Sequence, residues 1–243
     1  MLTSPSGFLN RTVLQATIAA ALLGTSASIS AATVVPGHSN PYLAGMPDGA
    51  ADGSDRAPDE SPVLVSGFTP SPGGQVSFIN AVGGTDRGGG CSLIPPYAGC
   101  DPIDGAAFFS HSGGDQNGIS AVRAPISALM GVFLGPDLPS LTAAPSGLNF
   151  QTLGLDFSTL SPALKQLFFI GDGKNAADAV QMFVVPAGAT RLYLGTMDGF
   201  GWFNNTGAIT VDVVAVPEPS SLALMLAGLV GIGWLARRGW RPR

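Results

Sequence analysis

The sequence predicts an all-β protein whose body is an antiparallel β-sandwich. Only 11% of the 243 residues are charged and 34 are glycine, which argues against a helical bundle and favours short strands joined by many turns. Residues 180–185, 191–194 and 208–214 are predicted strands. Within the third, Ile209, Val211 and Val213 share one face, because successive side chains of a strand alternate. Short strands with turn residues between them and almost no helix are typical of a sandwich.

The remaining elements follow from runs of apolar residues and from the residues that end them. Val76 and Phe78 alternate with polar neighbours and predict a strand over 75–79. Residues 83–118 are rich in glycine and proline and are predicted to be a loop. The nearly continuous apolar run 126–134 predicts a buried strand that ends before Pro136. Three further features are the ambiguous stretch 140–166 with a helical turn at 161–164, the short apolar segment 167–170, and the shared face of Thr190, Leu192 and Leu194.

The N-terminus has the layout of a secretory signal peptide over residues 1–32. Arg11 precedes an apolar stretch, 13–23, and small residues follow over 24–32, in the order that such peptides show. Residues 33–61 then contain four prolines and five acidic residues without apolar periodicity. We therefore expect a disordered leader over 33–61 and one folded domain over 62–215.

The C-terminal residues 216–243 contain three successive signals. Pro217, Glu218 and Pro219 form an extended segment, the uncharged run 222–236 predicts an apolar membrane helix, and four arginines follow it. The run is roughly 22 Å long at 1.5 Å per residue, so its polar flanks must help it to span a membrane. This three-part tail resembles the PEP-CTERM sorting signal of Gram-negative bacteria.

The PEP-CTERM resemblance implies a route out of the cell. It implies export across the inner membrane, transient anchoring through residues 222–236 and cleavage by a sorting protease, the exosortase. Proteins of this class go to the cell surface or to the exopolysaccharide matrix.

The charge distribution excludes one class of partner. The portion from residue 33 through Pro219 holds all sixteen acidic residues and only six of the eleven basic ones, so its net charge is −10. Such a surface has no electrostatic attraction for nucleic acid, whereas divalent cations suit it. We therefore expect no nucleic-acid partner.

Cys91 and Cys100 close a short loop with the sequence CSLIPPYAGC. In an exported protein, two cysteines at this spacing predict a disulfide rather than a metal or redox site. The bond is expected to hold a surface loop.

The best candidate site is the loop 195–207, which joins two predicted strands. Calcium takes six to eight oxygen ligands, usually from carboxylates, amides and backbone carbonyls. Asp198, Asn204 and Asn205 offer three such side chains, and the glycines of the loop allow carbonyls to turn inward. The alternative is a hairpin in which the asparagines and glycines serve only the turn.

Residues 185–213, VPAGATRLYLGTMDGFGWFNNTGAITVDV, resemble the C-terminal region of the soluble calcium-dependent galactophilic lectins of bacteria. The resemblance extends over about residues 74–214, with an insertion near 136–178, and implies a galactose-binding-domain-like jelly roll. It also implies that Asp198, Asn204 and Asn205 bind calcium and that the ion coordinates two sugar hydroxyls. This loop is one residue shorter than that of the family, which leaves the backbone-carbonyl ligand unassigned. The residues expected to contact the sugar are His111, Asp115, Gln116, Phe200 and Trp202.

No enzyme constellation stands out in the sequence. Its two histidines are His38 and His111, and no Gly-x-Ser-x-Gly elbow is present. We therefore predict an exported, non-catalytic, calcium-dependent carbohydrate-binding protein. One alternative is a structural matrix protein that uses calcium only for stability. Another is an enzyme acting on exopolysaccharide through a carboxylate pair, either Asp101 with Asp104 or Asp115 with Asp198.

Overall fold

The computed structural model describes residues 28–29, 32–216 and 228. The all-β prediction is confirmed, because strands in several sheets make up most of the regular structure. In these residues the helical elements are short: the helix α1 (Phe150–Leu153) and the 3₁₀ turns η1 (Pro41–Leu43), η2 (Pro139–Leu141) and η3 (Trp202–Asn204). The jelly-roll connectivity that the lectin resemblance implies stays a prediction.

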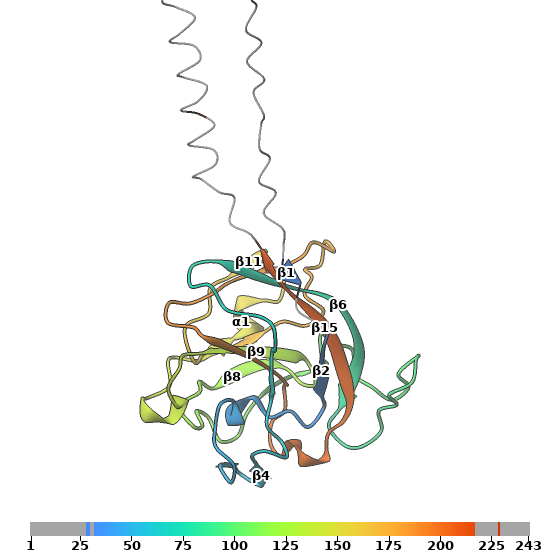
Figure 1. Cartoon of the computed structure of the whole chain (residues 1–243). Helices are drawn as coiled ribbons and strands as arrows, with labels where there is room; N and C mark the ends of the chain where they lie inside the picture. Colours follow the sequence, from blue (N-terminus) through green and yellow to red (C-terminus); the bar gives the residue numbers. More distant parts are fainter. Residues whose placement is uncertain (1–27, 30–31, 217–227, 229–243) are drawn as a thin grey trace, which may run out of the picture.

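The largest sheet is built around one long antiparallel pair. β6 (Gln75–Asp86) and β15 (Thr206–Val216) pair along almost their whole length, interrupted by a bulge between Thr210 and Asp212. They run side by side on the right of Figure 1. The order in this sheet is β1-β15-β6-β13-β11, and β2 also pairs with β15. The bounds of the other strands are β1 Ser28–Ile29, β2 Thr33–Pro36, β11 Thr159–Leu160 and β13 Met182–Val184.

Three smaller sheets complete the architecture. The second sheet has the order β12-β9-β14-β5, with β5 (Val63–Leu64), β9 (Leu129–Leu134), β12 (Leu167–Phe169) and β14 (Arg191–Thr196). The third has the order β10-β8-β7, with β7 (Phe108–Ser110), β8 (Val122–Pro125) and β10 (Leu148–Asn149). The fourth is the pair β3 (Ala51–Asp52) and β4 (Asp55–Arg56).

The core lies between the first and second sheets and consists largely of phenylalanine. Phe78 of β6 and Phe183 of β13 meet Phe168 of β12, with ring centroids 6.5 and 5.3 Å from that ring. Phe168 in turn stacks on Phe133 of β9 at 5.3 Å. On the other face of the second sheet, the ring of Phe169 packs on Phe150 of α1 at 5.8 Å. Both faces of β9 are therefore covered, which explains why all six of its residues are buried.

The strands expected near the C-terminus are present, and their apolar faces are as predicted, except that Thr190 precedes β14 and is exposed. Ile209, Val211 and Val213 are fully buried, and the exposure of Leu192 and Leu194 is at most 1%. The apolar run 126–134 is different, because β8 ends at Pro125 and β9 begins at Leu129 with a turn between them. Ser127 occupies that turn with a φ of 67°, a backbone conformation that a continuous strand does not contain.

Three further expectations differ from the structure. The segment 83–118 is not entirely loop, because it contains the end of β6 and all of β7. Among the described residues, the α-helical turn forms at Phe150–Leu153 rather than at 161–164, and Asn149 caps it by accepting from the Gln151 amide. The sheets are mostly antiparallel, but β10 with β8 and β11 with β13 are short parallel pairs.

The expected disordered leader, 33–61, is folded. It contains β2, η1, β3 and β4, and it buries Val35, Tyr42 and Leu43 almost completely. Its acidic residues do not all face water, because Asp52 and Asp55 are buried and have polar partners in the body, His111 and the Trp202 amide, respectively. Disorder was expected from the charge and proline content of this segment, but two of its five acidic residues, Asp52 and Asp55, are buried and have specific hydrogen-bond partners.

The targeting segments lie almost wholly outside the described residues. This applies to the signal peptide, apart from 28–29 and 32, to Pro217, Glu218 and Pro219, and to the apolar run 222–236, apart from Gly228. Within the described part of the chain, no helix is both long enough and apolar enough to cross a membrane.

Candidate functional site

The candidate calcium loop, residues 197–205, leaves the end of β14 and returns into β15. Two buried side chains, Met197 and Trp202, fix it to the body. The indole Nε1 of Trp202 donates a hydrogen bond to the carbonyl of Thr196 at 2.8 Å, which closes the loop across its base. The loop is therefore a packed element with a defined interior.

Asp198 points into this interior. Its side chain is 5% exposed, and its Oδ1 accepts hydrogen bonds from the amides of Gly199 and Phe200, at 2.5 and 3.4 Å. Burial raises the pKa of the Asp198 carboxyl, because a buried carboxylate loses its hydration. The side chain of Asn205, the two amides and the more distant Arg87 oppose that rise in pKa.

The structure brings Asn205 beside Asp198 but leaves Asn204 outside. Asn205 is 7% exposed, and its Oδ1 is a buried oxygen without a hydrogen-bond partner. Buried polar atoms are rarely left without one, so such an oxygen needs an explanation. Asn204 lies in η3 with its side chain exposed to solvent. Two of the three predicted ligands thus lie together.

A buried polar network adjoins this loop. Asn40 Nδ2 donates to Asp52 Oδ2 and to Asp55 Oδ2, both at 2.9 Å. Asp52 Oδ1 lies 3.1 Å from His111 Nε2, and the other ring nitrogen of His111 lies 3.1 Å from the carbonyl of Gly199. The network therefore links the segment 40–55 to the loop, through His111 and through Asp55, whose carboxylate accepts from the Trp202 amide at 2.8 Å.

Aromatic rings enclose His111. The ring of Tyr42 lies 4.4 Å from the imidazole and that of Trp202 lies 5.4 Å from it. Tyr42 is fully buried, and desolvation together with the nearby Asp52 charge raises the pKa of its phenol well above the usual range. Substrate-sized molecules have no access to His111 here, because its own exposure is 5%.

The residues expected to contact sugar are not gathered on one surface. His111 and Trp202 are inside the protein. The amide of Gln116 donates to the carbonyl of Gly113 at 2.7 Å, and Asp115 Oδ1 accepts from the Ala121 amide at 2.6 Å. Phe200 alone presents a ring to solvent, at 60% exposure. Stacking of a sugar on Trp202 is therefore incompatible with the observed packing, since the ring belongs to the core.

The two carboxylates of the candidate pair Asp101 and Asp104 each have a different hydrogen-bond partner. Asp101 Oδ2 accepts from the hydroxyl of Ser127 at 2.8 Å, whereas Asp104 Oδ1 accepts from the Asp172 amide at 2.9 Å. Burial and the nearby Asp172 charge raise the pKa of the Asp104 carboxyl, and the hydrogen bond from the Asp172 amide opposes this rise. Across the described residues, no group of three or more histidine, cysteine, aspartate or glutamate side chains has the arrangement of a metal site. Any cation at residues 197–205 must therefore rely on amide, carbonyl and water oxygens beside a single carboxylate.

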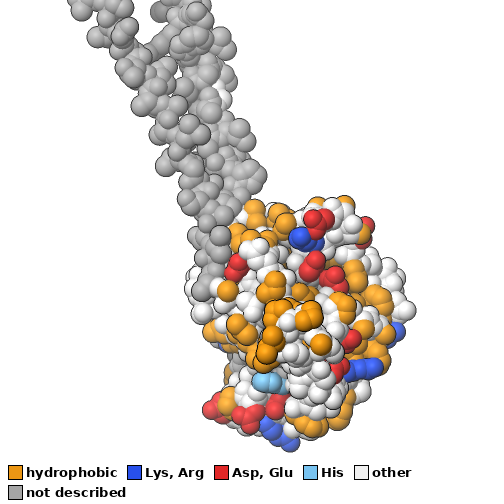
Figure 2. All heavy atoms as spheres, turned by 90° about the vertical axis from the view of Figure 1, so that its right-hand side faces the viewer, with side chains coloured by type: hydrophobic (Ala, Val, Ile, Leu, Met, Phe, Trp, Pro, Cys, Tyr) orange, Lys and Arg blue, Asp and Glu red, His pale blue; other side chains and the backbone are white. Residues whose placement is uncertain are grey.

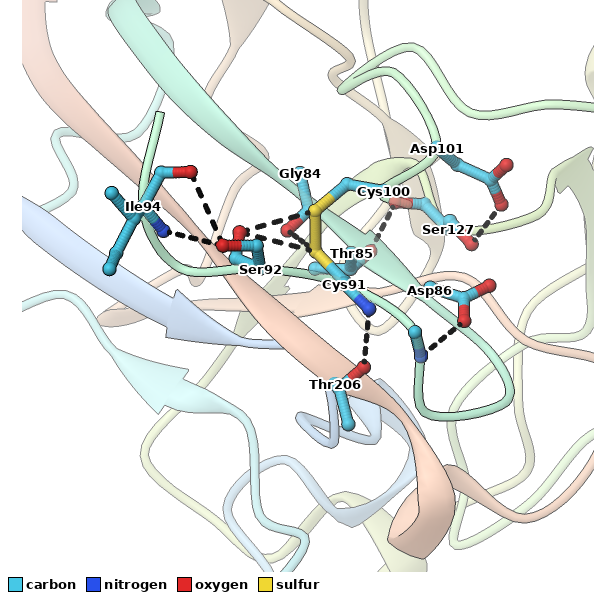
Figure 3. Close-up of a disulfide and its surroundings, with 11 residues drawn as sticks. Gly84, Thr85, Asp86, Cys91, Ser92, Ile94, Cys100, Asp101, Ser127 and Thr206 are labelled. Carbon is cyan, nitrogen blue, oxygen red and sulfur yellow. Dashed lines mark hydrogen bonds between the residues drawn. A yellow bond between two sulfur atoms is a disulfide. The ribbon is translucent and has the colours of Figure 1, made fainter. Parts of the chain in front are cut away.

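Cys91 and Cys100 form a disulfide, with their Cα atoms 4.4 Å apart (Figure 3). The loop they close is attached to the first sheet, because the Cys91 amide donates to Thr206 Oγ1 at 3.3 Å. Gly84 and Gly207 lie under the sulfurs, where an added Cβ would come within 2.8 Å of Cys100 Cβ and 2.4 Å of Cys91 Sγ, respectively. The disulfide and this hydrogen bond together hold the loop against the start of β15.

Sequence reasoning missed the polar network because it lies partly in the segment expected to be disordered. Asn40, Asp52 and Asp55 have neighbours in sequence that are typical of loops. The partners of Asp52 and Asp55 outside this segment are 59 to 148 residues away, and no spacing in one sequence indicates such pairings. The available signal was compositional, since Val34, Val35, Tyr42 and Leu43 are more apolar than a disordered leader requires.

Comparison with known proteins identifies one segment. The family model described as the PEP-CTERM protein-sorting motif matches residues 215–238, which include Pro217, Glu218 and Pro219. No curated protein and no solved structure matches the chain. The predicted sorting signal is confirmed, and the resemblance of the body to the lectins has no support from these comparisons.

Proposed function

Starting from the PEP-CTERM motif, which indicates an exported, exosortase-processed surface protein of Gram-negative bacteria, we propose that the body is a non-catalytic structural protein of the cell surface or matrix. We further propose that the loop of residues 197–205 binds one calcium ion, whose role is to stabilise the loop. Carbohydrate binding through that ion is the second candidate.

The observation that carries the calcium proposal is the pair formed by Asp198 and Asn205. A carboxylate with a raised pKa lies beside a buried amide oxygen that has no partner. A divalent cation would remove both unfavourable features, because it compensates the buried charge and coordinates the free oxygen. The two ends of an amide side chain have nearly the same shape, so Asn205 can turn to direct Oδ1 at a cation beside Asp198.

The remaining ligands would be backbone carbonyls and water. With one carboxylate and one amide, the site resembles weak extracellular calcium sites, for which dissociation constants are roughly 10⁻⁴–10⁻³ M. Calcium is the favoured cation because it accepts flexible coordination by oxygen, whereas magnesium demands near-octahedral geometry.

A non-catalytic role fits the surroundings of His111, which lies beside the loop. Both nitrogens of His111 lie within hydrogen-bond distance of protein oxygens, and the ring is enclosed by Tyr42 and Trp202. A general base must reach a proton of the substrate directly or through a water molecule. In this arrangement the imidazole is an internal linker.

Calorimetric titration of the full chain with calcium, together with thermal unfolding, tests the proposal. We expect binding in the sub-millimolar to millimolar range and a melting temperature that rises with calcium, since a ligand bound only by the folded state stabilises it. Asp198→Ala should abolish both effects. Asn204→Ala is the matched control from the same loop and should preserve them, because its side chain points to solvent. A wild-type protein that binds no calcium at millimolar concentration would contradict the proposal.

The second candidate depends on two exposed aromatic rings. Phe200 precedes the turn η3 and Phe203 lies within it, and the two residues are 60% and 59% exposed. Exposed aromatic rings pack well on the apolar faces of sugars. A glycan array with and without chelator separates the two functions. Calcium-dependent glycan binding that Phe200→Ala abolishes would favour the carbohydrate-binding function, whereas calcium-dependent stability without glycan binding would favour the structural one.

A further inference from the structure

The disulfide-closed loop, residues 91–100, presents an apolar tip to solvent. Leu93 and Ile94 are adjacent and are 67% and 74% exposed. Figure 2 looks onto the side of the molecule from which this loop projects and shows hydrophobic side chains gathered near the centre of that face. Single exposed apolar residues are ordinary, but neighbouring ones on a projecting loop indicate an interaction surface.

This tip is organised before any partner arrives. The disulfide closes the loop, the Ser92 amide donates to the carbonyl of Ala98 at 3.0 Å, and the Tyr97 amide donates to that of Ile94 at 2.9 Å. Pro95 and Pro96 further restrict the backbone. Binding through a preorganised loop loses little conformational entropy, which favours association.

A second unexplained feature is an apolar pocket of about 450 Å³. Its volume is within the range, roughly 300–1,000 Å³, of pockets that enclose small ligands, so it has room for two aliphatic side chains. The exposed Leu138 and Leu141 stand at its rim. The apolar residues that line it are Leu134, Pro136, Leu138, Pro139, Leu141 and Leu164.

The walls of this pocket are fixed by two basic side chains. Lys165 Nζ donates to the carbonyls of Thr142 and Ala143, at 3.0 and 2.7 Å, and to Thr142 Oγ1 at 2.6 Å. Arg191 donates to the carbonyls of Gly135 and Asp137. All three ammonium protons of Lys165 have acceptors within the protein, so the lysine is not free to bind an anion. The pocket therefore suits an apolar occupant.

The loop tip and the pocket both lack net charge, so two copies can meet there. The exported portion is strongly acidic, so most contacts between two copies are repulsive. Residues 88–100 contain no charged side chain, and the pocket is lined by one acid and one base, Asp137 and Lys165. The tip and the pocket are thus places where two copies can touch without opposition from like charges.

We propose that the tip formed by Leu93 and Ile94 of one copy inserts into the pocket beside Leu141 of a second copy. The two features are on opposite sides of the molecule: in Figure 1 the loop between β6 and β7 projects to the right, and the yellow-green turn η2 of the pocket rim lies at the left. A copy therefore cannot fill its own pocket. The interface is heterologous, each copy keeps one free tip and one free pocket, and the assembly is an open head-to-tail chain.

Each contact is small. It involves much less than the roughly 800 Å² per partner of a standard stable interface, so isolated pairs are weak and assembly requires high local concentration. Retention at a surface supplies such a concentration. The assembly does not depend on calcium and is separate from the function proposed for residues 197–205.

Sedimentation velocity of the full chain, solubilised in detergent and with chelator present, tests the proposal. The tip variant carries Leu93→Asp with Ile94→Asp, and the pocket variant carries Leu141→Asp. The matched control is Leu153→Asp, because Leu153 is 58% exposed on α1 and outside the pocket. All the altered residues are exposed, and thermal unfolding verifies that each variant is folded.

We expect the sedimentation coefficient of the wild type and of the control to increase with concentration beyond that of a dimer. The tip and pocket variants alone should each remain monomeric. A mixture of these two variants should form dimers and nothing larger, because one intact tip and one intact pocket remain for pairing. Concentration-independent monomers of the wild type at millimolar concentration, equal association of all variants, or failure of the mixture to dimerise would each overturn the proposal.

Discussion

The carboxylate of Asp55 accepts a hydrogen bond from the backbone amide of Trp202 at 2.8 Å, across 147 residues of sequence. The same oxygen, Oδ2, also accepts from the Asn40 side chain, and the other oxygen accepts from the Phe203 amide at 3.2 Å. Asp55 therefore joins the N-terminal segment, the polar network and the turn η3. The first turn of η3 has no side-chain cap of its own, so Asp55 supplies that function from a distant part of the chain.

Asp55→Ala should destabilise the folded protein. The substitution leaves the Trp202 and Phe203 amides without an acceptor in a buried site, which is expected to lower the free energy of unfolding by about 3 kcal/mol. Chemical denaturation followed by tryptophan fluorescence measures the change. Asp59→Ala is the control, because Asp59 is exposed and its removal should alter stability by less than about 0.5 kcal/mol. Equal stability of the two variants would show that the amides find other acceptors.

Asp198→Asn should change the dependence of stability on pH. Burial raises the pKa of Asp198 above its ordinary value of 3.8, so the folded state binds the proton more tightly than the unfolded chain does. This contribution to stability is fully present below about pH 4 and is lost as the pH rises through the raised pKa. An asparagine stays neutral and its oxygen can still accept from the Gly199 amide.

In chelator, the Asp198→Asn variant should therefore melt a few degrees above the wild type at about pH 7 and at nearly the same temperature at about pH 3. In saturating calcium the order at neutral pH should reverse, because only the wild type gains stability from the ion. Differential scanning calorimetry at the two pH values measures both effects. A variant that melts below the wild type in chelator at neutral pH would contradict this account of Asp198.

Gly131→Ala should disturb the aromatic core. An added Cβ would lie 2.5 Å from Cζ of Phe168 and 2.9 Å from Cδ1 of Ile170, distances too short for contact between carbon atoms. Overpacking of this kind lowers stability by about 1–3 kcal/mol. Gly88→Ala serves as the control, because the nearest atom to its added Cβ is 4.0 Å away. Denaturant unfolding distinguishes the two, and wild-type stability of the Gly131 variant would mean that the phenylalanine layer shifts freely.

The sequence predicted best where a strand has one buried and one exposed face. In β15 the alternation of Ile209, Val211 and Val213 with polar residues is enough to give both the strand and its orientation. It predicted less well where both sides are buried, as in β9, because a continuous apolar run does not indicate the turn at Ser127. That turn depends on a hydrogen bond from the Ser127 hydroxyl to Asp101, a long-range contact.

The candidate site was predictable only in part for a similar reason. Asp198 and Asn205 are seven positions apart in one loop, so the residue types indicated both, but they indicated the exposed Asn204 equally. The partners of His111 come from segments near residues 52 and 199, and Trp202 takes its acceptor from β14 beneath the loop. Whether an aromatic residue in a glycine-rich loop faces solvent or core is decided by such packing, and Trp202 and Phe200 have opposite outcomes.

β15 has a mechanical consequence for a protein that is sorted through its C-terminal side. The strand runs from Thr206, where Cys91 is attached, to Val216, within the matched sorting segment, and it is paired with β6 on one side and with β2 and β1 on the other. When the body is held at the opposite end of the sheet, near Thr206, a pulling force transmitted through residue 216 acts along the strand axis. It loads the interstrand hydrogen bonds in shear, all at once, and does not peel them apart in succession. The strand that leads to the sorting motif is therefore also the one best placed to bear tension.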